Sequence, residues 1–242
     1  MDDALSLYEF LPVSFRNKDE EKYIQFLQNA FEKNYEIGSF EFAGLAFHLL
    51  YMSFFCFSVW QIKLARKVDF DKAMVGFTND TENHLANATT PFDFYEKVKE
   101  ATIFRFLKLI GCDNQQVGSY SRFVKNRNRM AHPSGTVFFN DGAELDRYLS
   151  EVIKELGNIQ GHMTPVLHDL MKDFLLHSYD PETRENIGAG DEITANLIHQ
   201  NYFSQKDIEA CLTFDINSLS GHEHFDDIKL LFDDFVKSYS QN

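Results

Sequence analysis

The sequence predicts an all-α protein, and three observations support that prediction. Apolar residues recur at the three- and four-residue spacing of a helix over most of the chain, and no segment shows the period-two alternation of a half-buried strand. The chain contains 25 Phe but only 5 Pro, a ratio that favours packed helices over a loop-rich scaffold. With 44% hydrophobic residues among 242, it can bury a sizeable core.

The first half of the chain is expected to begin as an arm with hydrophobic anchors, over residues 1–15, and to continue as helices. A helix is predicted at residues 19–35, and Gly38 ends it. Residues 40–66 form a second helix that is apolar almost all round, so we expect it to be buried. Shorter helices follow at residues 69–77 and 80–86, and Pro91 suits the first turn of a helix that runs to residue 110.

The second half is predicted to contain two longer helices and a small extension. Residues 117–131 form a helix that Pro133 ends, because proline lacks the backbone donor and clashes with the preceding turn. An extended link at 136–139 leads to a helix that Asp141 caps, that continues to residue 177 and that Pro165 is placed to kink. Further helices are expected at residues 191–200, 204–214 and 223–239, with Ser204 and Asp207 as an N-terminal capping pair.

The polar stretch 180–190 contains Pro181, Gly188 and Gly190 and is interpreted as a linker. It divides the chain into a helical domain at residues 1–179 and a small helical C-terminal appendage at 191–242. This appendage is acidic and aromatic-rich, which suits docking of a partner protein.

A soluble, cytoplasmic protein is expected. Residues 42–60 lack Lys, Arg, Asp and Glu, but their length is marginal for a bilayer span and they include Gly44 and His48. We interpret them as a long buried helix, in the core or at a subunit interface. The chain begins with acidic residues, unlike a secretory signal. Its three cysteines lie far apart without a CxxC or zinc-ligand spacing, which indicates reduced thiols (Cys56, Cys112 and Cys211).

The net charge of −14 argues against a general nucleic-acid binder, but the charge is unevenly distributed. Between residues 101 and 135, six cations face a single anion, Asp113, so this segment carries +5 and the remainder carries −19. An acidic body with one basic segment favours a local phosphate site over a broad binding groove.

The most informative run in the sequence lies within that basic segment, at residues 120–135. It contains Arg127-Asn128, then Ala131-His132 at the predicted end of a helix, and it resembles the HEPN superfamily signature, an Arg followed after four to six residues by His. The glycine that commonly follows the His is replaced here by Pro133, with Gly135 two positions later. The resemblance implies a HEPN-like helical bundle.

The same resemblance implies a metal-independent endoribonuclease without a cofactor. In such a site His132 would move protons, Arg127 would stabilise the charged phosphate, and Asn128 would orient the imidazole or contact RNA. HEPN proteins commonly form homodimers whose two motifs meet in one cleft. The implied substrates are tRNA or single-stranded RNA, and the implied settings are stress response, phage defence or a toxin–antitoxin pair with a neutralising partner.

Three further cations fall at helical spacing beside the motif. Arg122, Lys125 and Arg129 form a basic stripe that we assign to RNA phosphate binding, although a solvated helix face would look the same. Arg127 and His132 are five residues apart, or about 140° around an ideal helix, so one straight helix would not aim them at one atom.

Other interpretations stay open from the sequence. A non-catalytic HEPN module that binds a protein partner is the main alternative, and a nucleotide-binding regulator is a third. His48 suits a satisfied core histidine, although a role in a cleft is compatible with its position. The run His222-Glu223-His224 better suits a solvated helix start than a metal site.

Overall fold

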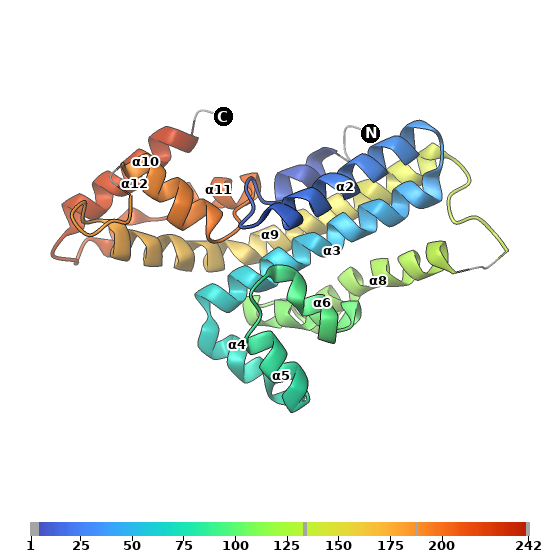
Figure 1. Ribbon diagram of the computed structural model, residues 1–242, viewed down its shortest axis with the longest axis horizontal. Coiled ribbons are helices and arrows are strands. Elements are labelled where there is room, and N and C mark those ends of the chain that lie inside the picture. Colours follow the sequence, from blue (N-terminus) through green and yellow to red (C-terminus); the bar gives the residue numbers. More distant parts are fainter. Residues whose placement is uncertain (1–4, 133–134, 187, 241–242) are drawn as a thin grey trace.

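The computed structural model describes residues 5–132, 135–186 and 188–240, and most of these residues are helical (Figure 1). Over that part of the chain the only strand-like pairing is an isolated bridge between Pro12 and Ser204. The predicted all-α class is therefore confirmed. A HEPN-like arrangement of the bundle remains a prediction.

An antiparallel pair of helices, α2 (Lys18–Glu36) and α3 (Phe40–Ala65), forms the centre of the fold. Asn17 caps α2 by accepting hydrogen bonds from the backbone N–H groups of Asp19 and Glu20. Gly38 makes the turn between the helices at a φ of 74°, a conformation that side-chain-bearing residues rarely adopt. Both helices lie within one residue of their predicted bounds.

The apolar helix α3 is a core helix in this structure. It is long and apolar enough to cross a membrane, but 83% of its most apolar window is buried by the rest of the protein. The helix contacts α2, α8 and α9, and its Phe47, Phe55 and Val59 have no exposed surface. This burial is compatible with a soluble protein, as predicted; the cytoplasmic location stays a prediction.

Residues 67–110 form a block of short helices on one side of α3, the lower part of Figure 1. The block comprises α4 (Lys67–Ala73), η2 (Met74–Gly76), α5 (Asn79–Ala86), η3 (Pro91–Asp93), α6 (Phe94–Lys97), α7 (Glu100–Ile103) and η4 (Phe104–Ile110). The single helix predicted from Pro91 to Ile110 is wrong, because Val98 and Lys99 are extended and break it. The break buries both Phe94 and Phe104 in the core and turns Glu100 toward α3.

Helix α8 (Asn114–Ala131) packs on α3 and bears the predicted motif. It begins three residues earlier than predicted, because Asp113 and Gln116 form a capping box. The buried Tyr51 hydroxyl donates to the Tyr120 carbonyl over 3.1 Å and joins the two helices. The helix ends at Ala131, and His132 is extended, as a residue before proline tends to be; Pro133 itself lies outside the described residues.

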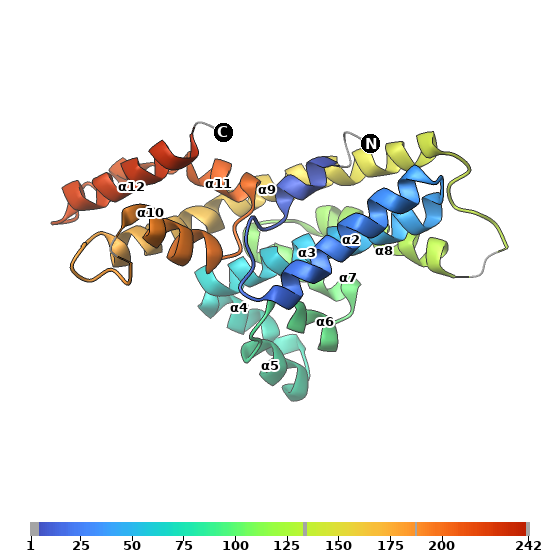
Figure 2. The ribbon, with the colours of Figure 1, turned by 45° about the horizontal axis from the view of Figure 1, so that its top comes forward.

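The longest helix, α9 (Gly142–Ser178), extends along most of the long axis of the molecule (Figure 2). Asp141 caps it as predicted, and the helix continues through Pro165. Its first half packs with α3, and its second half carries the C-terminal segment. That segment comprises α10 (Ala189–Glu192), the π-helix η5 (Ile193–His199), α11 (Gln205–Cys211), η6 (Ile216–Leu219) and α12 (Phe225–Tyr239).

The C-terminal segment shares buried polar contacts with the N-terminal helices. The Asp207 carboxylate accepts hydrogen bonds from Gln61 on α3 over 3.0 Å and from Gln160 on α9 over 2.7 Å. The buried Tyr202 hydroxyl donates to Glu20 on α2 over 2.9 Å. Residues 191–240 therefore contribute to the same core as the α2–α3 pair, and their role as a separable appendage remains a prediction.

Candidate functional site

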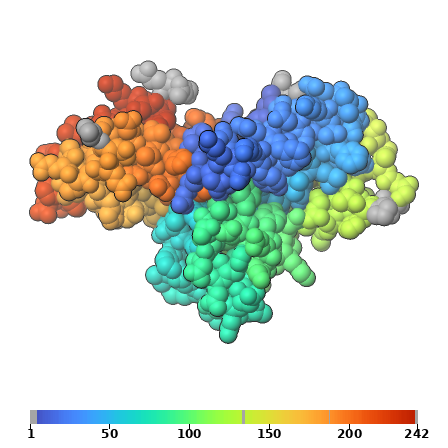
Figure 3. All heavy atoms as spheres, viewed as in Figure 1, coloured from blue at the N-terminus to red at the C-terminus, as the bar shows by residue number. Residues whose placement is uncertain are grey.

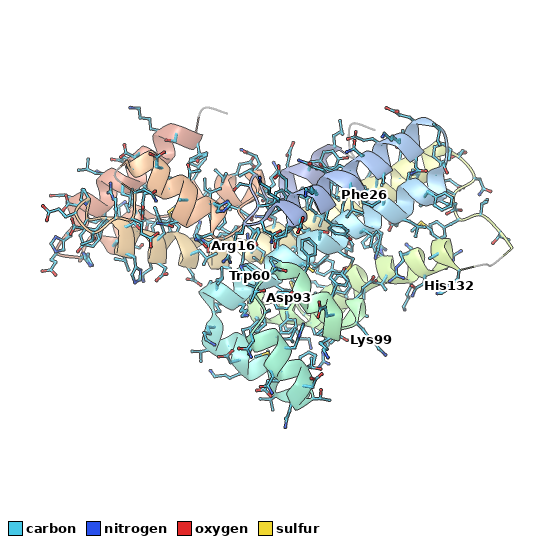
Figure 4. All side chains as sticks on the ribbon, viewed as in Figure 1. Arg16, Phe26, Trp60, Asp93, Lys99 and His132 are labelled. Carbon is cyan, nitrogen blue, oxygen red and sulfur yellow. The ribbon has the colours of Figure 1, made fainter. Side chains whose placement is uncertain are left out.

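His132 is the residue that follows the last turn of helix α8, at its C-terminal end. The backbone N–H of His132 still donates to the Asn128 carbonyl over 3.0 Å, but its own backbone is extended and its side chain is exposed. Figure 4 places His132 beyond the last turn of α8, away from the packed body of the protein. An exposed imidazole at this position is accessible to a large substrate or to a second copy of the chain.

Arg127 lies one and a half turns before His132 and points toward α7. Its Nη2 is 2.5 Å from Oε2 of Glu100, and the two side chains are 28% and 16% exposed. Arg127 Nε is buried without a hydrogen-bond partner, so this nitrogen adds no second contact to the carboxylate. The ion pair through Nη2 holds the guanidinium beside α7.

His48, in the first half of α3, is the third side chain beside this ion pair. Its side chain has no exposed surface, and its Nε2 is 3.5 Å from Oε2 of Glu100, without the alignment of a hydrogen bond. Burial lowers the pKa of His48, and this outweighs the opposing effect of Glu100. The imidazole is therefore neutral at pH 7.

Glu100 is ionised in this cluster. Burial would raise the pKa of its carboxyl group, but His48 and Arg127 together outweigh burial and lower it to about 2. The result is a charged carboxylate that orients Arg127 beneath α8. Together His48, Glu100 and Arg127 link α3, α7 and α8, and we call them the His48 cluster.

The other predicted site residues occupy different surroundings. Asn128 is half-buried, and no hydrogen bond joins its side chain to that of His132. Arg122 pairs with Glu151 at 3.1 Å, and the Arg129 guanidinium lies 4.8 Å from the centre of the Phe138 ring. Lys125 is exposed and makes no ion pair among residues 5–132, 135–186 and 188–240.

The segment after the motif is anchored to the start of α3. The Glu41 carboxylate accepts the backbone N–H groups of Phe138 and Phe139. Gly44 lets this segment approach closely, because a Cβ at that position would be 2.7 Å from Cε2 of Phe139 and 2.9 Å from Sδ of Met130. The start of α3 therefore fixes the end of α8 and the segment beyond it.

Two members of the His48 cluster were not selected as site residues from the sequence. His48 is a conspicuous polar residue in an apolar helix, and that contrast was a usable signal for a buried polar contact. Glu100 belongs to no motif and lies 27 residues before Arg127, so nothing local identifies it as the partner of that arginine. Its position depends on the break at Val98, which the sequence did not reveal.

No group of three or more His, Cys, Asp or Glu side chains suited to hold a metal ion occurs within the part of the chain that the structure describes. The run at His222 and His224, which the sequence favoured as a solvated helix start over a metal site, lies just before α12, and the His224 ring stacks on Tyr179 at 5.0 Å. These rings have a packing role that needs no metal.

Comparison with known proteins finds no family model, no curated protein and no solved structure that matches this chain. The HEPN resemblance therefore rests on the residues of the motif and remains a prediction.

Proposed function

We propose that this protein is a metal-independent endoribonuclease of the HEPN type. One observation carries the proposal: α8 ends so that the imidazole of His132 is exposed, five residues after an arginine that a half-buried, ionised carboxylate holds in place. A free imidazole and a positioned guanidinium are the two groups that cleavage through the RNA's own 2′-hydroxyl requires. Stress response, phage defence and a toxin–antitoxin pair are the settings that the resemblance suggests.

The proposed reaction is an internal transfer at one phosphate. The 2′-oxygen attacks the adjacent phosphorus as its proton passes to an imidazole, and the bond from phosphorus to the 5′-oxygen breaks as that oxygen takes up a proton. The products are a 2′,3′-cyclic phosphate and a 5′-hydroxyl. His132 supplies the proton transfers, and Arg127 stabilises the negative charge that builds on the phosphate oxygens.

A homodimer fits this chemistry better than a single chain. Arg127 and His132 are separated by about 7.5 Å of helix rise, and Arg127 points toward Glu100 while His132 is exposed at the helix end. The α2–α3 pair also leaves large apolar side chains exposed, among them Phe26 at 65% and Phe42 at 63%. We propose that a second copy covers this face and completes the site.

The test compares RNA cleavage by the parent protein and single variants. His132→Ala should lower the cleavage rate by about 10²–10⁴-fold, the usual contribution of general acid–base catalysis. Arg127→Ala should lower it to a similar extent through lost charge stabilisation. The matched control is His177→Ala, which removes another exposed histidine at the end of a long helix and should leave the rate unchanged.

The same experiment includes tRNA and single-stranded RNA, with EDTA present, and maps the ends that form. Cleavage should persist in the chelator and leave 5′-hydroxyl ends. Lys125→Ala should weaken RNA binding and reduce its salt dependence by about one charge, without removing the chemical step. Cleavage that needs a divalent metal, or that survives His132→Ala, would contradict the mechanism.

The second candidate is a non-catalytic HEPN module that binds a protein or a nucleotide. The Glu100–Arg127 ion pair favours it, because an arginine that is already paired can serve the fold alone. The acidic charge of the chain outside residues 101–135 also opposes RNA binding away from the motif. Absence of cleavage by the parent protein on every RNA tested would favour this candidate.

A further inference from the structure

A cavity of about 700 Å³ lies beside the His48 cluster, where α2 and α3 meet the segment from η3 to α7. Figure 2 shows α2 passing across α3 above α6 and α7, and Figure 3 shows residues of this green segment meeting the blue N-terminal helix on one face of the molecule. The volume is within the usual range for a small-molecule site. The cavity is lined by Asn17, Asp19, Glu20, Tyr23, Leu49, Ser53, Thr90, Phe92, Tyr95 and Glu100.

The charged groups of the lining are all acidic. Asp19, Glu20 and Glu100 contribute carboxylates, and no Lys, Arg or His belongs to the lining among the residues that the structure describes. Asp19 pairs with Lys22 and Glu100 pairs with Arg127, but both cations lie outside the lining of the cavity. A phosphate or carboxylate ligand would be repelled here, whereas a cation would be attracted.

Aromatic rings form much of the wall. Tyr23 and Phe92 meet edge to face with their ring centres 5.3 Å apart, and Tyr95 is the third ring of the lining. Ring faces attract organic cations, and they also bury the apolar body that carries such a charge. The wall and the carboxylates thus favour the same class of ligand.

Two polar side chains of the lining, Tyr95 and Glu100, have unused hydrogen-bonding capacity. The Tyr95 hydroxyl is buried and has no hydrogen-bond partner. Glu100 lines the cavity, and its Oε2 is buried between Arg127 and His48, so we assign its other oxygen, Oε1, to a ligand. A buried hydroxyl without a partner is unfavourable, and a ligand that donates hydrogen bonds would satisfy both oxygens.

We propose that this cavity is a binding site for an organic cation, a primary amine carried on an aromatic body. The ammonium group donates to Oε1 of Glu100 and to the Tyr95 hydroxyl oxygen, and the ring packs against Tyr23 and Phe92. The site does not depend on the proposed ribonuclease function. It does share the Glu100 carboxylate with Arg127, which pairs with Oε2 and leaves Oε1 to the ammonium group.

Isothermal titration calorimetry with the full chain at low salt and pH 7 tests the proposal. The probes are tryptamine and its neutral counterpart tryptophol, which share one ring system and differ in the terminal amine or hydroxyl. Tryptamine should bind at least about tenfold more tightly, because only the ammonium group gains from the carboxylates. Equal affinity of the two probes, or no binding of tryptamine, would overturn the proposal.

Variants locate the site. Glu100→Gln should weaken tryptamine binding about tenfold or more, whereas Glu96→Gln, a matched change at a 67% exposed carboxylate outside the cavity, should have no effect. Tyr95→Phe keeps the ring and removes only the unpartnered hydroxyl, so it should fold and weaken binding severalfold. If Glu100→Gln does not fold, Tyr95→Phe decides, and unchanged affinity in that variant counts against the site.

Discussion

At the scale of single residues, Glu100 and His48 show which parts of the candidate site the sequence could and could not predict. The sequence predicted a role for Arg127 from its motif, but the structure adds that a carboxylate 27 residues earlier holds its guanidinium. That partner could not be predicted, because it depends on where the helix predicted over residues 91–110 breaks. His48 illustrates the opposite case, since its buried position follows from the apolar helix around it.

Acid should destabilise the protein through this cluster in two steps. The folded-state pKa of His48 lies below its ordinary value of 6.5, so the unfolded chain binds a proton that the folded chain does not as the pH falls through 6.5. The folded-state pKa of Glu100 is about 2 against an ordinary 4.5, so its contribution is complete above pH 4.5 and is lost as the pH falls toward 2.

The free energy of unfolding, measured by urea titration between pH 7 and 5, checks the first step. His48→Leu removes the titrating group and keeps the apolar surroundings filled. Its stability should fall less steeply with decreasing pH than that of the parent, by up to about 1.4 kcal/mol per pH unit, the value for one proton. Parallel curves for the two proteins would show that His48 titrates alike in the folded and unfolded chains.

At the scale of elements, the helices that the sequence predicted best are those with a clear cap and a long apolar pattern. Helices α2 and α3 lie within one residue of prediction, and Asp141 and Ser204 cap their helices as expected. The short helices of residues 91–110 and the π-helix η5 were not predicted in that form. Tertiary packing determines these helices, because segments of three to seven residues carry too little periodicity to reveal their ends.

Gly44 on α3 allows the end of α8 and the segment after it to pack closely against α3. Gly44→Ala should destabilise the protein by about 1–3 kcal/mol, because the added methyl group would press on Phe139 and Met130 and displace the end of α8. The control is Gly157→Ala in α9, where nothing lies within 4 Å of the added methyl group; it should stabilise by about 0.5–1 kcal/mol.

Thermal unfolding of the two glycine variants, followed by circular dichroism, gives the comparison. Gly44→Ala should melt below the parent protein, and Gly157→Ala should melt above it. If both variants behave alike, close packing at Gly44 does not hold α8 against α3.

At the scale of the whole molecule, the structure joins most of its helices around a single core. Buried residues from Leu7 to Phe235 belong to one hydrophobic cluster, so the C-terminal segment packs as part of the protein although the sequence suggested a linker before it. The composition predicts that a large core exists. It does not predict the long-range contacts within that core, such as those of Asp207 with Gln61 and Gln160. The apolar side chains exposed on the α2–α3 pair and the exposed His132 at the end of α8 both favour an assembly of two chains.

Light scattering at micromolar concentration should give about 56 kDa, twice the chain mass of 28.1 kDa, if the α2–α3 face is a dimer interface. Phe42→Glu should give the monomer, because burying an unpaired charge opposes association. Leu230→Glu, at a residue 64% exposed on α12, is the matched control and should remain dimeric. A parent protein of 28 kDa would exclude this interface.

Mixing two inactive variants then tests whether the site is shared between chains. We expect Arg127 of one chain to act with His132 of the other, because Arg127 pairs with Glu100 whereas His132 is exposed beyond the end of α8. Arg127→Ala and His132→Ala, unfolded and refolded together in equal amounts, form mixed dimers in about half of the molecules, and each mixed dimer has one intact site and one doubly altered site. Cleavage should therefore return to about one quarter of the parent rate. If each site instead lies within one chain, no chain in the mixture has both residues, and the mixture stays inactive.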